Sequence, residues 1–262
     1  MSNFKFKKQF GQNFLIDNNV INKIVSDIKV FPNSLVIEIG CGDGRLTKYL
    51  CDKFDFVLGY EIDLEVKEDL YKNLDNYDNY EIIFDDFLKR DVINDLLNKS
   101  YDNLYVIANL PYYITTPIIE KLTLLNLNVQ LIRVMVQKEV GERFTALPGS
   151  KNYGSITVYL NYNYKVEKNF VVSRNCFFPK PNVDSIIISF YKKDKLFVKD
   201  EMFFYKLVRD SFKYKRKTIR NNLKNYDLDV IQKVLNKYNF DLSVRAEQLD
   251  VSIFCDIANS LK

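Results

Sequence analysis

The 262-residue chain contains no histidine and no tryptophan, and the missing histidine restricts the chemistry available to it. Ser-His-Asp triads, Cys-His dyads, HExxH zinc sites and histidine general bases all need an imidazole, so all of them are excluded. Any catalysis by this chain has to use carboxylates, amides, backbone groups, lysine, tyrosine or a cofactor.

Cysteine pairs and long apolar runs are missing as well. The four cysteines are scattered and form no CxxC motif, a pattern that suits neither a zinc site nor a disulfide scaffold and favours a reducing cytosol. No apolar run approaches the roughly 20 residues that a bilayer span requires. The first 15 residues carry charge but no apolar segment, so we expect no secretory signal, no membrane association and a cytoplasmic location.

Charge is distributed unevenly along the chain, although the net charge is only +4. Residues 1–190 sum to −2, whereas residues 191–262 sum to +6. Five positive side chains and no acid fall within 213-KYKRKTIR-220, and Lys5, Lys7 and Lys8 form a second basic group. Such clusters can bind phosphate backbones, and a solvated lysine-rich surface explains them equally well.

Apolar periodicity alternates between short strands and helices up to about residue 137. We expect strands at 35–39, 55–62, 80–84, 103–108 and 129–137, and helices at 17–28, 45–52, 64–74, 91–98 and 116–126. Alternation with short connections predicts an open parallel sheet with helices on both faces, the Rossmann-like α/β class. Segments 164–173 and 185–191 are interpreted as later strands of the same sheet.

The pattern changes after Lys192. Residues 200–262 show helical spacing and no convincing strand, so we predict a domain of residues 1–191 followed by a small all-helical domain of residues 192–262.

A glycine-rich loop, 38-EIGCGDG-44, follows the first strand and opens a helix. Glycines there allow a tight turn and a close approach of a ligand to the backbone, although the motif alone also fits a plain strand-helix turn. The next strand ends in 59-GYEID-63, which places Glu61 where doubly wound folds bind a ribose. The third strand ends at Asp85 and Asp86, and ligands bind at this carboxyl edge.

Charge separates two candidate cofactors for that edge. The spacing is GxGxG, whereas the dinucleotide fingerprint is GxGxxG. A rim with Glu38, Glu61 and Asp86 would repel a pyrophosphate and attract a sulfonium and an ammonium, so S-adenosylmethionine is favoured over NAD. Each acid alone could instead be a strand-end or capping carboxylate.

The segment 107-IANLPYYITTP-117 ends the fourth strand beside this rim. Leu110 precedes a proline and is therefore extended, and Pro111 stiffens the turn. Such a turn can aim the Asn109 side-chain oxygen and a nearby carbonyl at one point, next to the face of Tyr112. Two acceptors and an aromatic face suit the 6-amino group of adenine, whose nitrogen becomes more nucleophilic when its hydrogens are bound. A plain turn is the alternative interpretation.

Taken together, the motifs resemble the ribosomal RNA adenine dimethyltransferase family. The resemblance runs nearly end to end through 9-QFGQNFL-15, 38-EIGCGDG-44, 59-GYEID-63, 109-NLPY-112, 177-FFPKPNVDS-185, 216-RKTIRNNL-223 and 245-RAEQL-249. Any one of these motifs would be weak, but in this order they are specific.

The resemblance implies roles for particular residues. Asn13 and Leu15 would touch the cofactor, Gly40 would pack against its amino-acid part, Glu61 would bind the ribose and Asp86 the adenine amine. Asn109, Leu110, Pro111 and Tyr112 would form the reacting centre, with Phe177 as a second stacking aromatic, and Asn109 would also contact the cofactor. Phe178 is interpreted as a core residue, and the Asp85-Asp86 pair leaves the choice between the two aspartates open.

The implied function is dimethylation of two adjacent adenosines in the 3′-terminal hairpin loop of small-subunit rRNA, with S-adenosylmethionine and no metal. The family acts on a partly assembled small subunit, and we expect a monomer whose basic helix near 213–220 contacts RNA. The alternatives are a large-subunit rRNA adenine methyltransferase, a non-catalytic ribosome assembly factor and a small-molecule methyltransferase.

Overall fold

The computed structural model describes residues 13–125 and 127–262, so the predicted basic group Lys5, Lys7 and Lys8 lies outside the described residues. The chain divides into two compact units. The first consists of the residues up to Gly141 together with Glu167–Tyr191, and the second of Glu142–Val166 and Lys192–Lys262. One border therefore falls at residues 191 and 192, and residues 142–166 belong with the C-terminal helices.

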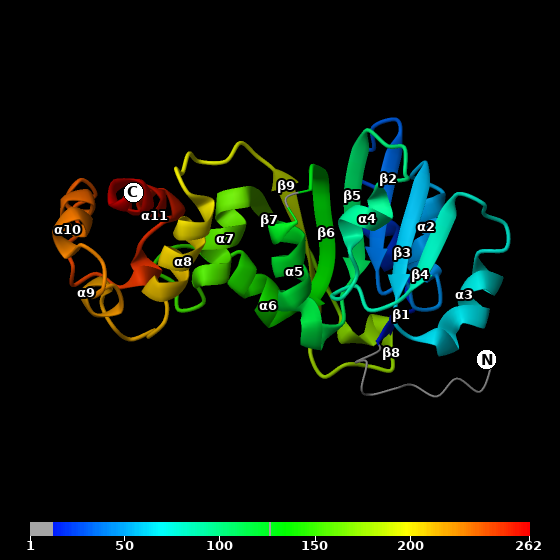
Figure 1. Cartoon of the computed structure of the whole chain (residues 1–262). Coiled ribbons are helices and arrows are strands. Elements are labelled where there is room, and N and C mark those ends of the chain that lie inside the picture. The colour runs from blue at the N-terminus through cyan, green and yellow to red at the C-terminus, as the bar shows by residue number, and fades with distance from the viewer. Residues whose placement is uncertain (1–12, 126) are drawn as a thin grey trace. The chain divides into compact units, whose positions relative to one another are not determined.

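A seven-stranded mixed sheet in the order β4-β3-β2-β5-β6-β9-β7 confirms the predicted Rossmann-like class (Figure 1). Its strands are β2 (Ser34–Ile39), β3 (Phe56–Glu61), β4 (Tyr80–Phe84), β5 (Asn103–Asn109), β6 (Val129–Gln137), β7 (Tyr164–Val172) and β9 (Ser185–Lys192). The strands β2 to β6 are parallel, and β9 runs antiparallel to β6. The carboxyl ends of β2, β3, β4 and β5 consequently share one edge.

Both faces of the sheet are buried, which explains the nearly continuous apolar strands. All six residues of β2 are buried, and Glu38 is the one acid among them. Val36 packs in a cluster with side chains of α1 (Asn18–Val25) and α2 (Arg45–Cys51). The neighbouring Ile37 points to the opposite face because strand side chains alternate, and it is equally buried.

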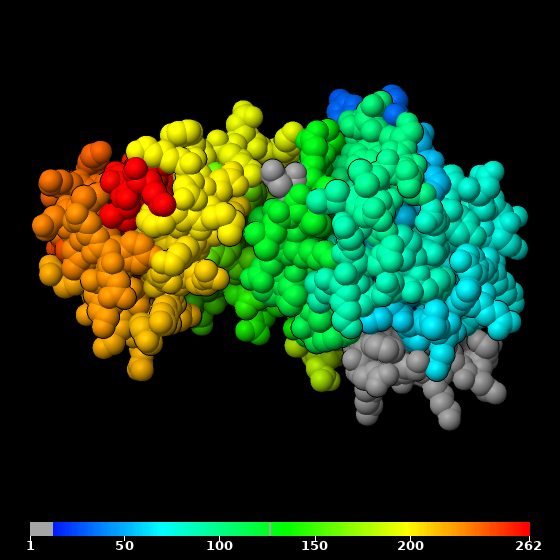
Figure 2. Space-filling model, in the orientation of Figure 1, coloured from blue at the N-terminus to red at the C-terminus, as the bar shows by residue number. Residues whose placement is uncertain are grey.

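Helices α4 (Val92–Leu96) and α5 (Thr115–Leu124) lie in front of the strands in Figure 1. In the space-filling view their side chains cover the strands drawn behind them (Figure 2). Helix α3 (Lys67–Asn73) follows the 3₁₀ turn Leu64–Val66 and packs near α2. All five helices predicted in the first unit are present, each within a few residues of its expected ends.

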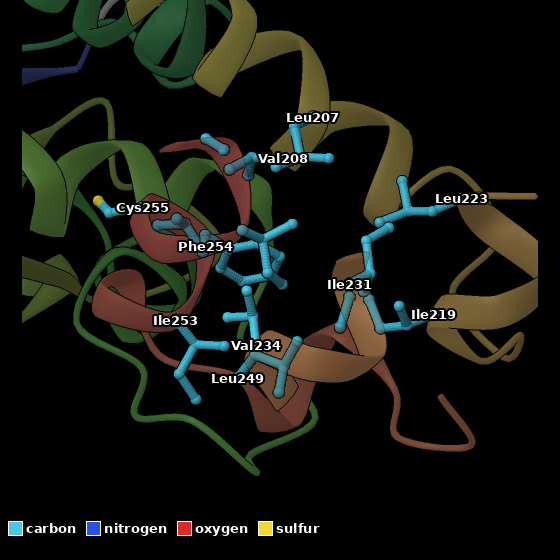
Figure 3. Packing of buried hydrophobic residues seen from close by; sticks show 14 of the residues in the cluster. Leu207, Val208, Ile219, Leu223, Ile231, Val234, Leu249, Ile253, Phe254 and Cys255 are labelled. Carbon is cyan, nitrogen blue, oxygen red and sulfur yellow. The ribbon is translucent and has the colours of Figure 1, made fainter. Parts of the chain in front are cut away.

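The second unit is built from helices, as predicted, and the described part of it has no named strand after Lys192. Its C-terminal helices are α8 (Glu201–Ser211), α9 (Ile219–Asn222), α10 (Leu228–Asn236) and α11 (Val251–Leu261). Figure 3 shows Phe254 of α11 at the centre of the core, with Val208 of α8 and Val234 of α10. Helix α7 (Ser155–Asn163) contributes Val158 and Tyr162 to the same core.

Three elements are not part of the sequence prediction. These are helices α6 (Lys138–Phe144) and α7, and a two-stranded ribbon in which β1 (Phe14–Leu15) pairs antiparallel with β8 (Phe177–Phe178). Strands of two residues have no detectable period in the sequence. The ribbon forms because residues about 160 positions apart meet in the fold. Among the described residues, no helix has the length and apolar character of a bilayer span.

Gly59 in β3 tests how closely the central strands are packed. An added Cβ would lie 2.5 Å from both Cys41 Sγ and Ile82 Cδ1, so we expect Gly59→Ala to lower the free energy of unfolding by about 1–3 kcal/mol. Urea unfolding of the pure variant measures this change.

The matched control is Gly154→Ala, where an added Cβ meets nothing within 4 Å and the backbone is extended. We expect a change within about 0.5 kcal/mol there. Equal losses in the two variants would contradict the close packing around Gly59.

Candidate functional site

A cavity opens at the carboxyl edge of the first unit, and most of the predicted site residues line it. Its lining includes the predicted residues Asn13, Leu15, Glu38, Gly40, Glu61, Asp85, Asp86, Asn109, Leu110, Pro111 and Tyr112. These residues come from the ends of four parallel strands and from β1. The tertiary structure therefore brings together the residues predicted to bind a cofactor and the NLPY segment, as the strand-end argument predicts.

The glycine loop between β2 and α2 has a backbone that only glycine adopts readily. Gly40, Gly42 and Gly44 all have positive φ angles, of 79°, 55° and 81°. A Cβ on Gly42 would lie 2.9 Å from the ring of Phe14, so this glycine is also required by close approach. Gly40 packs near the ring of Pro111, where an added Cβ would lie 3.8 Å from Pro111 Cδ.

Glu61 ends β3 and connects it to the glycine loop. Its Oε2 accepts a hydrogen bond from the Gly42 amide at 2.8 Å, and its Oε1 accepts one from the Asp63 amide at 2.8 Å. The side chain is 6 % exposed, and burial raises the pKa of Glu61 although these backbone hydrogen bonds lower it. Two backbone hydrogen bonds therefore hold this carboxyl group in the cavity wall.

The two aspartates after β4 differ in exposure and partners. The Asp86 side chain is 24 % exposed, and its Oδ1 accepts the Leu88 amide at 3.0 Å. The Asp85 side chain is 46 % exposed, and its Oδ1 accepts the Asp86 amide at 2.7 Å. Lys121 of α5 fixes the loop that follows, since its Nζ donates to the carbonyls of Phe87, Leu88 and Arg90 at 2.6–3.0 Å.

Asn109 ends β5 at the cavity and is half-buried. Its Nδ2 donates to the carbonyl oxygen of Asn13 at 3.2 Å, which sets the orientation of the amide and turns Oδ1 into the remaining acceptor. The next residue, Leu110, is 1 % exposed, and its amide donates to the Met135 carbonyl at 3.2 Å. The segment is thus held from both sides, by the β1 segment and by β6.

The rest of the NLPY segment forms a fixed turn. Pro111 has φ −58° and ψ 128°, and a 3₁₀ turn over Tyr112–Ile114 follows it. The Tyr112 hydroxyl lies 2.7 Å from Ser185 Oγ, and Thr115 Oγ1 donates to the Pro111 carbonyl at 3.1 Å. Burial raises the pKa of Tyr112, so this hydroxyl stays protonated near neutral pH and the ring is anchored at its far end.

The aromatic pair at 177–178 is placed differently from the other site residues. Phe177 is 3 % exposed and packs in the core with Leu15, its partner in the β1-β8 ribbon, and it does not line the cavity. Phe178 lies opposite Phe14 and is 54 % exposed, so its interpretation as a core residue is wrong. The stacking role of Phe177 stays a prediction.

Sequence reasoning missed several residues of the cavity wall. Phe14, Asp43, Arg45, Ile62 and Tyr113 line it, and Asp43 forms an ion pair with Arg45 at 2.9 Å. Each is a direct neighbour of a predicted motif residue or lies within the glycine loop. That proximity is the signal that could have identified them.

Most of the basic segment 213–220 is not helical, which corrects the sequence prediction of a helix there. Residues 213–218 form the turn between α8 and α9, Arg220 lies in the first turn of α9, and the five basic side chains are exposed. Asn222 holds this turn, because its Nδ2 donates to the Ser211 carbonyl at 2.7 Å and its Oδ1 accepts the Tyr214 amide at 3.2 Å. Side-chain hydrogen bonds to the backbone, such as those of Asn222, stabilise a turn in place of a helix. The spacing of residues in the sequence does not show which of the two structures forms.

Metal ligands do not gather in the part of the chain that the structure describes. No group of three or more cysteines, aspartates and glutamates there has the arrangement needed to hold a metal ion.

Comparison with known proteins places this chain in a known family. The family model described as "Ribosomal RNA adenine dimethylase" matches residues 3–262. The chain is 42% identical over 269 residues to "Ribosomal RNA small subunit methyltransferase A" of Bacillus cereus (strain B4264), with 98% of this chain and 92% of that protein covered. The protein of the same name from Bacillus mycoides (strain KBAB4) is also 42% identical over 269 residues, with the same coverage.

Solved structures agree with this assignment. A dimethyladenosine transferase from Plasmodium falciparum superposes with a TM-score of 0.79 at 27% identity, covering 93% of this chain and 95% of that one. The 23S rRNA methyltransferase ErmE shares the fold with a TM-score of 0.74 at 22% identity, covering 95% and 99% of the two chains. Because the family model matches residues 3–262 of it, the chain belongs to the ribosomal RNA adenine dimethylase family.

Proposed function

We propose that this protein transfers methyl groups from S-adenosylmethionine to the N6 atoms of two adjacent adenosines in the 3′-terminal hairpin loop of small-subunit rRNA. The observation that carries the proposal is the position of Asn109. Its amide lies at the end of β5, is oriented by the Asn13 carbonyl and shares one cavity with Gly40, Glu61 and Asp86.

The cavity fits S-adenosylmethionine by charge, and the buried Glu38 Oε2 in its wall has no hydrogen-bond partner. Glu61 would hold the ribose hydroxyls, and Asp86 the adenine amine, while Asn13, Leu15 and Gly40 would enclose the remainder. Acidic walls suit a cationic ligand and would repel a pyrophosphate. When bound, the cofactor supplies an activated methyl group.

The chain's own residues would position and activate the acceptor amine. Asn109 Oδ1 and the Leu110 carbonyl would accept its two hydrogens, so that the nitrogen lone pair withdraws from the purine ring and points at the methyl group. Pro111 fixes the angle between the two acceptors. Tyr112, anchored through Ser185, would stack on the base, and Phe177 is proposed for its other face.

The second unit would supply the RNA contact. Its basic turn carries exposed Lys213, Lys215, Arg216 and Lys217, and exposed Arg220 follows in α9. These side chains suit a phosphate backbone. We accordingly retain the division into a methyltransferase domain of residues 1–191 and an RNA-contacting domain of residues 192–262 as part of the proposal. We further propose that the protein acts as a monomer in the cytoplasm on a partly assembled small subunit.

Relatives support the small-subunit substrate over its alternatives. The Bacillus cereus protein named for the small subunit is 42% identical, whereas the 23S rRNA methyltransferase ErmE is 22% identical and shows a shared fold alone. Assaying both ribosomal subunits as methyl acceptors separates the two substrates. Calorimetry with S-adenosylmethionine separates an enzyme from a non-catalytic assembly factor, which would show no binding.

Asn109→Ala tests the acceptor role of the amide. We expect methyl transfer to small subunits lacking the modification to fall by about 100-fold or more, because one of two acceptors for the amine is lost. Radiolabelled transfer, followed by mass spectrometry of the nucleosides, measures the change.

The control is Asn103→Ala at the opposite end of the same strand, where the side chain donates to the Pro32 carbonyl at 2.8 Å. That variant should retain most of the wild-type rate. Activity of Asn109→Ala close to that of the control would remove the proposed role.

Glu61→Gln tests the proposed role of Glu61 in binding the cofactor. Each of the two carboxylate oxygens of Glu61 accepts a hydrogen bond from a backbone amide. A glutamine has one acceptor oxygen, and its NH₂ group would face the other amide, so the loop at Gly42 loses a charged hydrogen bond. Hydrogen bonds to charged groups contribute about 1.5–3 kcal/mol, so we expect S-adenosylmethionine affinity to fall by about 10- to 150-fold in calorimetry. Glu65→Gln, at an exposed neighbouring position, should leave it unchanged.

The double variant Arg216→Ala, Lys217→Ala tests the basic turn. Each lost phosphate contact should reduce the slope of log affinity against log salt by about 0.7–0.9, so we expect weaker subunit binding and a slope shallower by about 1.4–1.8. Filter binding over a salt series measures both quantities. Lys233→Ala, Lys237→Ala on exposed positions of α10 is the matched control, and an identical slope in both double variants would argue against the turn.

A further inference from the structure

Glu38 is a buried carboxyl without a cationic partner among the described residues. It lies in the central strand β2, is 1 % exposed and lines the cavity. Its Oε2 makes no hydrogen bond, and neither does the hydroxyl of Thr47, the neighbouring buried side chain on α2. Leaving a carboxylate oxygen buried and unpartnered is costly unless the group is protonated or a ligand approaches it.

The groups around Glu38 do not favour its charge. The glycine loop contributes the Cys41 thiol and Asp43, β3 contributes Glu61, and α2 contributes Thr47 and Cys51. The two charged neighbours that act on Glu38 most are the acids Glu61 and Asp43.

Nearby Arg45 is already paired with Asp43. Burial, reinforced by these acids, raises the pKa of Glu38 to about 8, although Thr47 and Cys41 lower it. The carboxyl is accordingly neutral for most of the time at pH 7.

The ligand of the proposed function would change this balance. S-adenosylmethionine carries a sulfonium and an ammonium against one carboxylate, so it brings net positive charge into a cavity whose wall includes Glu38. A cation within about 4–6 Å lowers a carboxyl pKa by about 1–3 units. Ionisation of the buried Glu38 carboxyl group would therefore stabilise the positive charge of the ligand.

We propose that Glu38 is a charge-selecting residue of the cofactor site: neutral in the free protein, it gives up its proton to solvent when the cationic methyl donor binds. The proposal rests on the proposed function for its ligand. It assigns a role to the acid at the start of the glycine motif that differs from holding the ribose or the adenine. It also explains how a buried strand tolerates an unpaired carboxyl, because the free protein keeps it uncharged.

A pH dependence of binding follows directly. Because binding releases a proton, affinity for S-adenosylmethionine should rise with pH, by up to tenfold per unit below about pH 8, and then level off. The α-amino group of the ligand also titrates near 7.7–8.0, and above this range it opposes the rise. The contribution of Glu38 is therefore the difference between the wild type and a variant without the carboxyl.

Calorimetry in two buffers of different ionisation enthalpy measures the released proton. With S-adenosylmethionine at pH 7, we expect the wild type to release about 0.4–0.9 proton per ligand, as the pKa of Glu38 falls from about 8 by about 1–3 units, and Glu38→Gln to release less than about 0.2. Glu65→Gln is the matched control, since Glu65 is an exposed acid that lies outside the cavity lining. That variant should release as much as the wild type.

Two results would overturn the proposal: no proton release by the wild type, or equal release by the wild type and Glu38→Gln. A failure of S-adenosylmethionine to bind at all would instead count against the proposed function. The two failures are thus distinguishable.

A ligand-free measurement tests the neutral state by itself. The folded pKa of Glu38 lies above its unfolded value, so the native state holds more protons and stability should fall as pH rises from about 4.5 to about 8. Melting temperatures of wild type and Glu38→Gln across this range isolate the effect, since other groups contribute to both. We expect a flatter profile for the variant, and parallel profiles would show that Glu38 is ionised in the free protein.

Discussion

The hydrogen bond from the Gly42 amide to Glu61 Oε2 is the interaction on which the site depends. It joins the loop after β2 to the end of β3, two segments that the parallel pairing of these strands brings to the same edge. Glycine suits this position because its φ angle is positive and because Phe14 leaves no room for a side chain. The cavity wall is therefore set by one strand pairing, one glycine and one buried carboxylate.

The proposed site has no histidine, so it would act by positioning the reacting groups and by the charge of its side chains. Asn109 is oriented by the Asn13 carbonyl, Leu110 by Met135, and Tyr112 by Ser185. Each of these contacts fixes a group before any substrate arrives, which is how preorganised dipoles lower a barrier without reorganisation. The proposed transfer needs no more, because the methyl donor carries its own leaving group.

The sequence predicted the sheet well because parallel, doubly covered strands leave an unmistakable pattern. The segments 80–84 and 129–137 are strands with the predicted bounds, and Glu61 and Asn109 end their strands at the cavity as expected. The ribbon of β1 and β8 left no such pattern. Its register decides that Phe177 faces the core and Phe178 the surface, and a shift of one residue would exchange them.

The basic segment and Glu38 also separate what the sequence determines from what the tertiary structure decides. Residue types alone determined that 213–220 is cationic and that an acid precedes the glycines, since charge belongs to the side chain wherever it lies. Only the tertiary structure decided that residues 213–218 of this segment form a turn held by Asn222 and that Glu38 is buried without a cation. The physical reason is that burial, and with it the pKa of a carboxyl, depends on neighbours brought in from distant parts of the chain.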